Sequence, residues 1–143
     1  IGREVDRVFI FPREIDSTCS ERKHNLKGEK TSAGTVPSTA FVYRHAESGG
    51  WFSWDFEVLP DQPMELLCTY WGGDANRTFD IVVDDELLAT QELKPERPGE
   101  TVDVVYPIPV ESTKGKTQVT IAFRANHSTM AGGVFGCAIL KQK

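Results

Sequence analysis

Along several stretches of this chain, every second side chain is apolar. In the clearest stretch, residues 51–58, alternate positions carry four large apolar side chains, Phe52, Trp54, Phe56 and Val58. Alternation with a period of two is typical of a β-strand that buries one face, and it constrains the fold more than any other feature. No stretch of the sequence repeats apolar side chains at the 3.6-residue spacing of an amphipathic helix. The sequence therefore predicts an all-β chain with little helix.

Shorter runs of the same kind bring the number of predicted strands to eight. They are residues 8–11, 51–58, 64–71, 78–83, 87–93, 102–108, 119–125 and 134–140. Asp84-Asp85 lies between two of these runs and favours a β-hairpin, although Asp-Gly is the more typical turn. Pro107 ends its strand or holds it at a sheet edge, because proline cannot donate to the ladder. Regularly spaced short strands favour a two-sheet β-sandwich or a barrel, and we predict the sandwich.

Residues 12–43 are the part of the chain that is poorest in pattern. They are mostly polar and include glycine and proline, so we expect them to wrap the sandwich as an extended loop. The whole chain, residues 1–143, is expected to form a single domain, with an N-terminal strand and extended segment over residues 1–23. Because the sequence begins at Ile1 and not at Met, we expect it to be a piece of a larger enzyme.

Charge, apolar runs and cysteines limit the function of this chain. The formal net charge of −5 argues against a nucleic-acid partner, because phosphate binding relies on concentrated Lys and Arg. No apolar run approaches the roughly 18–20 residues that cross a bilayer, so we expect a soluble domain. The three cysteines, Cys19, Cys68 and Cys137, include no Cys-x-x-Cys metal pair. Cys68 and Cys137 lie in predicted strands, where we expect buried thiols that act as small hydrophobes.

Residues 70–77, with the sequence Tyr-Trp-Gly-Gly-Asp-Ala-Asn-Arg, form the first candidate site. They connect two predicted strands and should therefore lie as a loop at one rim of the sandwich. The face of Trp71 suits stacking on a sugar, while Asp74, Asn76 and Arg77 offer hydrogen bonds to hydroxyl groups. The alternative is structural: Trp71 packs in the core and Arg77 pairs with an acidic side chain to fix the turn. The sequence leaves both interpretations open.

The second candidate is Trp51, which follows a pair of glycines at the start of a predicted strand. Neighbouring side chains on a strand point to opposite faces, so Trp51 and Trp54 cannot share a face. Trp54 falls on the same face as Phe52 and Phe56, which places it in the predicted core. For Trp51, on the other face, both core packing and ligand binding stay open.

The third candidate is a group of polar residues from two segments. His24, Asn25, Arg44 and His45 would line a polar cleft if the long loop folds over the rim; the alternative is that they face solvent. The histidines lack metal-ligand spacing, so we assign no metal site. Acidic residues are plentiful, but the sequence selects no carboxylate pair of the kind that hydrolyses glycosides. We therefore assign no catalytic residue.

Five short segments together resemble a particular module. They are residues 24–29 (His-Asn-Leu-Lys-Gly-Glu), 49–54 (Gly-Gly-Trp-Phe-Ser-Trp), 70–74 (Tyr-Trp-Gly-Gly-Asp), 77–81 (Arg-Thr-Phe-Asp-Ile) and 131–136 (Ala-Gly-Gly-Val-Phe-Gly). As a set they look like the C-terminal β-sandwich of large secreted bacterial glycoside hydrolases of the β-L-arabinofuranosidase type, common in gut Bacteroidetes. The resemblance implies a galactose-binding-like jelly roll. It also implies that the catalytic residues lie in a preceding helical barrel, no motif of which can be matched here.

From this resemblance we expect a non-catalytic accessory module of a secreted glycoside hydrolase. The expected partners are a plant-type glycan or the parent catalytic domain, with no nucleic acid and no membrane, and the expected location is secreted, periplasmic or cell-surface. Docking on the catalytic domain would need an apolar patch on one sheet face, for which Trp51 and Val105 are candidates. The competing hypotheses are a self-sufficient glycoside hydrolase domain and a purely structural spacer. We expect no cofactor, and the sequence leaves open a structural calcium ion.

Overall fold

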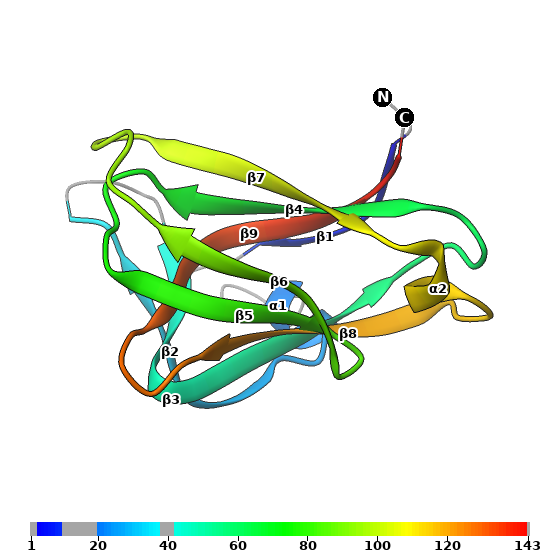
Figure 1. Ribbon diagram of the computed structural model, residues 1–143, viewed down its shortest axis with the longest axis horizontal. Coiled ribbons are helices and arrows are strands. Elements are labelled where there is room, and N and C mark those ends of the chain that lie inside the picture. Colours follow the sequence, from blue (N-terminus) through cyan, green and yellow to red (C-terminus); the bar gives the residue numbers. More distant parts are fainter. Residues whose placement is uncertain (1–2, 10–19, 38–41, 143) are drawn as a thin grey trace.

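The computed structural model of the protein describes residues 3–9, 20–37 and 42–142 (Figure 1). The strands in these ranges are β1 (Glu4–Phe9), β2 (Lys27–Thr35), β3 (Val42–Glu57), β4 (Met64–Trp71), β5 (Arg77–Val83), β6 (Glu86–Leu93), β7 (Thr101–Ile108), β8 (Gln118–Ala125) and β9 (Ala131–Lys141). The helices are α1 (Ser20–Lys23) and α2 (Val110–Thr113). Neither of these short helices is long and apolar enough to cross a membrane. The prediction of an all-β chain with little helix is confirmed.

The strands form one hydrogen-bonded path, β6-β5-β8-β3-β9-β4-β7, with β1 added to β9 and β2 added to β3. The path bends into two facing layers, one with β1, β4, β7 and β9 and the other with β2, β3, β5, β6 and β8 (Figure 1). β3 joins the layers, because Arg44 and Ala46 pair with β9 whereas residues 51–57 pair with β8. Between these pairings Gly49 has a φ of +80°, which favours glycine. The predicted β-sandwich is confirmed, in a barrel-like form.

The side chains that the alternation predicts to face inward fill the space between the layers. Phe52, Trp54 and Phe56 of β3 are fully buried. The Phe52 ring stacks on Phe123 of β8, with the ring centroids 5.1 Å apart. In β4 every second residue from Met64 to Tyr70 is fully buried, as expected for a central strand that is paired on both sides. Each large apolar side chain buried in this way contributes roughly 1.5–3 kcal/mol, so this core is the main source of stability.

The hairpin predicted at Asp84-Asp85 joins β5 to β6 through a two-residue turn. Asp84 and Asp85 have φ values of +46° and +72°, and a type I′ turn requires positive φ at both central residues. The Asp84 carboxylate accepts hydrogen bonds from the Thr120 backbone N–H at 2.8 Å and from the Lys116 ammonium at 2.7 Å. These bonds stabilise Asp84 in a backbone conformation that L-residues rarely adopt, which explains how the turn forms without Asp-Gly.

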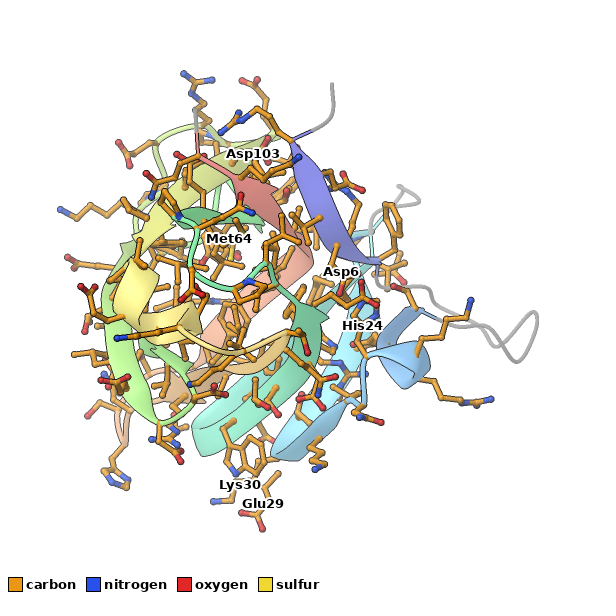
Figure 2. The ribbon with its side chains drawn as sticks, turned by 90° about the vertical axis from the view of Figure 1, so that its right-hand side faces the viewer. Asp6, His24, Glu29, Lys30, Met64 and Asp103 are labelled. Carbon is orange, nitrogen blue, oxygen red and sulfur yellow. The ribbon has the colours of Figure 1, made fainter. Side chains whose placement is uncertain are left out.

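The expectation that residues 12–43 form one extended loop is wrong, because residues 27–35 form β2, which pairs antiparallel with β3. Most side chains of β2 are exposed, and Figure 2 shows Glu29 and Lys30 projecting away from the molecule. Backbone hydrogen bonds to β3 therefore stabilise this strand, and its sequence needs no apolar alternation. Within the same expected loop, residues 20–23 form α1, and residues 12–19 and 38–41 lie outside the described ranges.

Two further boundaries differ from the predictions. The N-terminal strand β1 begins at Glu4 and not at residue 8, and it pairs with β9; residues 10–11 of the predicted strand lie outside the described residues. β3 begins at Val42 and not at residue 51, because its first part carries polar side chains and a glycine bend that hide the strand pattern. By contrast β7, which carries Pro107, lies at one end of the sheet path, as predicted for a strand that contains proline.

Cys68 and Cys137 are fully buried, as predicted, and lie opposite each other on β4 and β9. Their sulfur atoms are 3.4 Å apart and both thiols are free. Burial raises the pKa of the Cys137 thiol well above its usual value, so this thiol stays protonated and unreactive. Cys19 lies outside the described residues.

Candidate functional site

A small pocket lies at the end of the sandwich where β4 ends and β5 and β9 begin, on the left in Figure 1. Its volume is about 190 Å³. We call it the rim pocket, and its lining residues are Val36, Pro37, Tyr43, Trp71, Asp74, Arg77, Gly133 and Phe135. The structure therefore brings together Trp71, Asp74 and Arg77, three residues of the first candidate site.

Aromatic rings from three strands form the apolar wall of the rim pocket. The ring centroids of Trp71 and Phe135 are 6.0 Å apart, and those of Phe135 and Tyr43 are 5.8 Å apart. His45 does not line the pocket but packs against Tyr43, with the ring centroids 5.4 Å apart. The wall needs glycine at position 133, because a Cβ there would lie 2.8 Å from Cδ1 of Tyr43. Trp71 itself is only partly buried. It therefore forms part of the pocket wall and not, as the structural alternative has it, part of the core.

The loop after β4 is held by backbone hydrogen bonds and depends on a glycine. The Gly72 N–H donates to the Glu100 carbonyl at 2.7 Å, and the Gly72 carbonyl accepts from the Arg97 N–H at 3.0 Å. A Cβ at position 72 would lie only 2.3 Å from the Arg97 carbonyl oxygen, so a larger residue would displace the chain. The Asp74 N–H donates to the Trp71 carbonyl at 3.2 Å, which closes the turn. Trp71 and Asp74 thereby come to line the same pocket.

Asp74 and Arg77 give the rim pocket an acidic and a basic group. Nη1 of Arg77 lies 3.7 Å from Oδ2 of Asp74 and donates a hydrogen bond to the Gly132 carbonyl at 3.2 Å. Burial raises the pKa of Asp74, and the charge of Arg77 opposes part of this shift. Burial lowers the pKa of His45, and the Arg77 charge lowers it further, so the His45 ring is neutral at pH 7. The pocket thus offers a carboxylate acceptor and guanidinium donors beside its aromatic wall.

The remaining residues of this region were less well predicted. Asn76 is exposed, has a φ of +58° and does not line the pocket. Arg77 forms an ion pair with Asp74, as the structural alternative predicts, and it also lines the pocket. The sequence did not single out Tyr43 and Phe135. The signal for Tyr43 is its alternation with His45, which predicts a strand face. Phe135 lies where the glycine-rich segment, residues 131–136, enters the last predicted strand, residues 134–140.

Arg44, from the third candidate group, binds a different part of the molecule. Its guanidinium forms two hydrogen bonds with the carboxylate of Glu21 in α1, and the Trp54 indole N–H donates to the same carboxylate at 3.2 Å. Glu21 is only 5% exposed. We call Glu21, Arg44 and Trp54 the Glu21 cluster. It attaches α1 to β3, so its polar atoms are used within the fold.

His24 and Asn25 follow α1 and are also engaged within the fold. Nε2 of His24 lies 2.8 Å from Oδ1 of Asp6, and Figure 2 shows the two side chains next to each other. The Asn25 amide donates to the Asp55 carboxylate at 2.9 Å. Of the two alternatives for this group, the polar cleft is not formed by these three residues, because each directs its polar atoms at another residue of the fold and none lines the rim pocket. Asn25 is exposed, as the solvent-facing alternative predicts, whereas His24 and Arg44 are partly buried.

Trp51, the second candidate, lines a separate groove of about 740 Å³ on the outer face of the other layer. We call it the Trp51 groove, and its lining residues are Lys27, Trp51, Ser53, Val82, Asp84, Asp85, Thr120, Ala122 and Arg124. It shares no residue with the rim pocket. Within the described residues, no group of three or more His, Cys, Asp or Glu side chains could hold a metal ion.

Several solved structures share this architecture. A family 35 carbohydrate binding module from Clostridium thermocellum matches with a TM-score of 0.60 and 17% identity, over 82% of this chain and 93% of that chain. The module CBM6cm-2 of Cellvibrio mixtus lichenase 5A, solved with cellotriose, matches with a TM-score of 0.57 and 11% identity, over 86% and 95% of the chains. An exo-beta-1,3-galactanase from Phanerochaete chrysosporium matches with a TM-score of 0.60 and 10% identity, over 83% of this chain but 28% of the galactanase. At these identities the likeness shows the fold alone, a jelly-roll β-sandwich.

No curated protein matches the chain. Residues 18–140, which include every residue that lines the rim pocket, match a family described as a family of unknown function, DUF6805. Because this match covers most of the sequence, the chain belongs to the DUF6805 family.

Proposed function

We propose that this chain is a non-catalytic module that binds a carbohydrate in the rim pocket. The observation that carries the proposal is the joint lining of one pocket by an aromatic wall and by Asp74 and Arg77. Sugars combine apolar C–H faces with hydroxyl groups, so they fit a site that has both ring faces and charged hydrogen-bonding groups. Two bacterial proteins that share the fold of this chain are carbohydrate binding modules, which adds support.

The size of the rim pocket suits one sugar ring. A volume of about 190 Å³ equals that of about six water molecules at ~30 Å³ each. In this proposal, a sugar ring stacks on Trp71 and Phe135, while Asp74 accepts hydrogen bonds from its hydroxyl groups and Arg77 donates to them. One stack and a few hydrogen bonds correspond to a dissociation constant on the order of 1 mM, or about −4 kcal/mol.

The number of carboxylates in the rim pocket supports a binding role over a catalytic one. Glycoside hydrolases mostly use two carboxyl groups that flank the scissile bond. Among the described residues that line this pocket, Asp74 is the only carboxylate. A self-sufficient hydrolase is therefore the weaker hypothesis, and hydrolysis of an aryl-glycoside by the isolated chain would revive it.

We further propose that the module accompanies a secreted glycoside hydrolase of the β-L-arabinofuranosidase type that acts on plant glycans. The galactanase supports the accessory part of this proposal, because the region of that enzyme that matches this chain makes up only 28% of its length. The docking alternative has less support. Trp51 and Val105 lie on different layers, on β3 and β7, so they do not form a single apolar patch. A structural calcium ion also stays a prediction, which melting the protein with and without a chelator would test.

The proposal is tested by titrating the chain with arabinans and simple sugars while following binding by calorimetry. We expect saturable binding in the millimolar range, and we expect Trp71→Ala to weaken the binding of simple sugars at least tenfold, because the stacking surface is lost. Val105→Ala is the matched control, since Val105 is 44% exposed and lies in neither the rim pocket nor the Trp51 groove. Simple-sugar binding that Trp71→Ala leaves unchanged would contradict the role of the pocket. Loss of stability without any sugar binding would favour the structural spacer.

A further inference from the structure

The Trp51 groove crosses four neighbouring strands, β2, β3, β8 and β5. The register of these strands places one residue from each side by side in a row: Lys27 pairs with Ser53, Ser53 with Ala122, and Ala122 with Val82. Strands lie about 4.8 Å apart, so this row is about 14 Å long. The row is longer than a single sugar ring, and it runs across the strands.

The row Ser53-Ala122-Val82 forms the floor of the groove. These three side chains point outward yet are only 3%, 8% and 5% exposed, because larger neighbours stand on both sides of them. Trp51 and Arg124, which pair with each other, stand on one side. On the other side are Thr120 and Asp84, joined by a hydrogen bond from the Asp84 N–H to the Thr120 carbonyl. Small residues between two raised rows create a trough.

The Trp51 side chain forms the aromatic part of one wall. Within the described residues its ring packs against no other aromatic ring, and its indole N–H makes no hydrogen bond. The indole of Trp54 differs, because it packs against Phe52 and donates to Glu21. Tyrosine and tryptophan side chains, which have an apolar body and a polar hydrogen-bonding group, are enriched at protein interfaces. Trp51 therefore offers both a ring face and a free N–H donor at the edge of the trough.

The charges that line the groove balance. Lys27 and Arg124 are basic, whereas Asp84 and Asp85 are acidic. Asp84 is already bonded to Lys116, and Arg124 lies 3.3 Å from Asp85 in an exposed ion pair. A nucleic acid or an anionic lipid would need an excess of positive charge, which this lining lacks. The balance instead fits a neutral ligand with many hydroxyl groups.

From the trough, its aromatic wall and its balanced charges, we propose that the Trp51 groove is a second binding site, which holds a segment of a neutral polysaccharide laid across β2, β3, β8 and β5. For the class of ligand this inference rests on the proposed function. The two sites differ in shape: the rim pocket has room for one ring, whereas the trough lets a chain pass through. A polysaccharide that reaches both sites gains affinity, because its second contact is intramolecular.

The test measures binding of soluble neutral polysaccharides (arabinan, galactan and β-glucan) and of simple sugars to five proteins. They are the wild type, Trp71→Ala, Trp51→Ala, Ala122→Gln and the control Val105→Ala. Ala122→Gln fills the floor of the trough and leaves Trp51 in place, so it tests the groove without removing a core contact. Melting curves and circular dichroism establish that each variant is folded.

We expect Trp71→Ala to lose simple sugars and to keep polysaccharide binding. We expect Trp51→Ala and Ala122→Gln to lower polysaccharide affinity at least fivefold and to leave simple sugars unaffected. The inference is overturned if Trp71→Ala abolishes all binding, if Trp51→Ala and Ala122→Gln both bind like the wild type, or if no polysaccharide binds. The two proposals fail separately: a wild type that binds polysaccharide through Trp51 but binds no simple sugar would refute the rim pocket and support the groove.

Discussion

The Glu21 cluster and the rim pocket contain the same three residue types, a tryptophan, an arginine and a carboxylate, in different states of pairing. In the Glu21 cluster, Arg44 and Trp54 both donate to the Glu21 carboxylate. The side chains of Arg44 and Glu21 are 11% and 6% exposed, and Trp54 is fully buried. Buried charges are tolerated when they are paired and hydrogen-bonded, and these groups meet that condition. The cluster stabilises the fold and leaves no acceptor for a ligand.

In the rim pocket the pairing is looser. The nearest atoms of Arg77 and Asp74 are 3.7 Å apart, beyond hydrogen-bond distance, and their side chains are 25% and 18% exposed. Trp71 packs beside the ring of Phe135 at the surface instead of within the core. Arg77 donates to the Gly132 carbonyl and Asp74 accepts from the Gly133 backbone N–H, but neither group is held in a close side-chain pair, so both keep hydrogen-bonding capacity for a ligand. The comparison teaches that the completeness of pairing, and not the residue types, separates a structural cluster from a candidate binding site.

Among the tests of this comparison, Glu21→Gln is expected to have the largest effect on the free energy of unfolding. This variant leaves the positive charge of Arg44 buried without its counter-charge, and breaking a buried pair in this way costs about 3–5 kcal/mol. Urea denaturation measures the loss in the free energy of unfolding. Sugar binding by the folded fraction should not change, because Glu21 does not line the rim pocket.

Glu4→Gln is the matched control for Glu21→Gln. Glu4 pairs with Arg7 at 2.8 Å, but the two side chains are 50% and 32% exposed. Surface pairs of this kind contribute about 0–1 kcal/mol. If Glu21→Gln were as mild as Glu4→Gln, the Glu21 cluster would have no special role in stability and the comparison would break.

The sequence predicts the parts of the fold in which side chains carry the information. Phe52, Trp54 and Phe56 alternate because one face of their strand packs in the core, and burial at these positions agrees with the prediction. β2 escapes prediction for the opposite reason. Its stability comes from backbone hydrogen bonds to β3, which any residue except proline can donate, and its exposed side chains carry no pattern.

The candidate site is predictable only within one loop. Trp71, Asp74 and Arg77 are close in sequence, so a turn brings them together. Tyr43 and Phe135 come from β3 and β9, and their approach depends on where β3 bends, which the sequence does not specify. The same limit explains the error for Arg44: its partner Glu21 lies in a short helix more than twenty residues away.

A smaller effect is expected from Gly133→Ala, which acts on the rim pocket through shape. The added methyl group would lie 2.8 Å from Cδ1 and 2.9 Å from Cγ of Tyr43, so the ring must move into the pocket or away from its wall. Overpacking of this kind costs about 1–3 kcal/mol. Sugar affinity should fall severalfold in the same titration that tests Trp71→Ala.

A double-mutant cycle separates this clash from other effects of Gly133→Ala. In a Tyr43→Ala background the methyl group meets no ring, so most of its cost in unfolding free energy should disappear. An equal cost in both backgrounds would show that Tyr43 is not the residue that excludes a side chain at position 133. The aromatic wall would then not depend on this glycine.

The smallest effect on stability, and the one most specific to a binding site, is expected from Asp74→Asn. Because burial raises the pKa of Asp74 in the folded chain, folding favours the protonated carboxyl group. The contribution of Asp74 to stability is therefore present below its pKa in the unfolded chain and is lost as the pH rises through its raised pKa in the folded chain. At pH 7, Asn mimics the favoured neutral form, so Asp74→Asn should be at least as stable as the wild type in thermal melts.

The variant should still bind sugar more weakly, since an amide oxygen accepts hydrogen bonds less strongly than a carboxylate. Wild-type affinity should also fall as the pH drops through the raised pKa of Asp74, whereas the affinity of Asp74→Asn should stay level. A variant that is clearly less stable at pH 7 would place Asp74 with Glu21 as a structural group, because its pairing with Arg77 would then outweigh the cost of its burial.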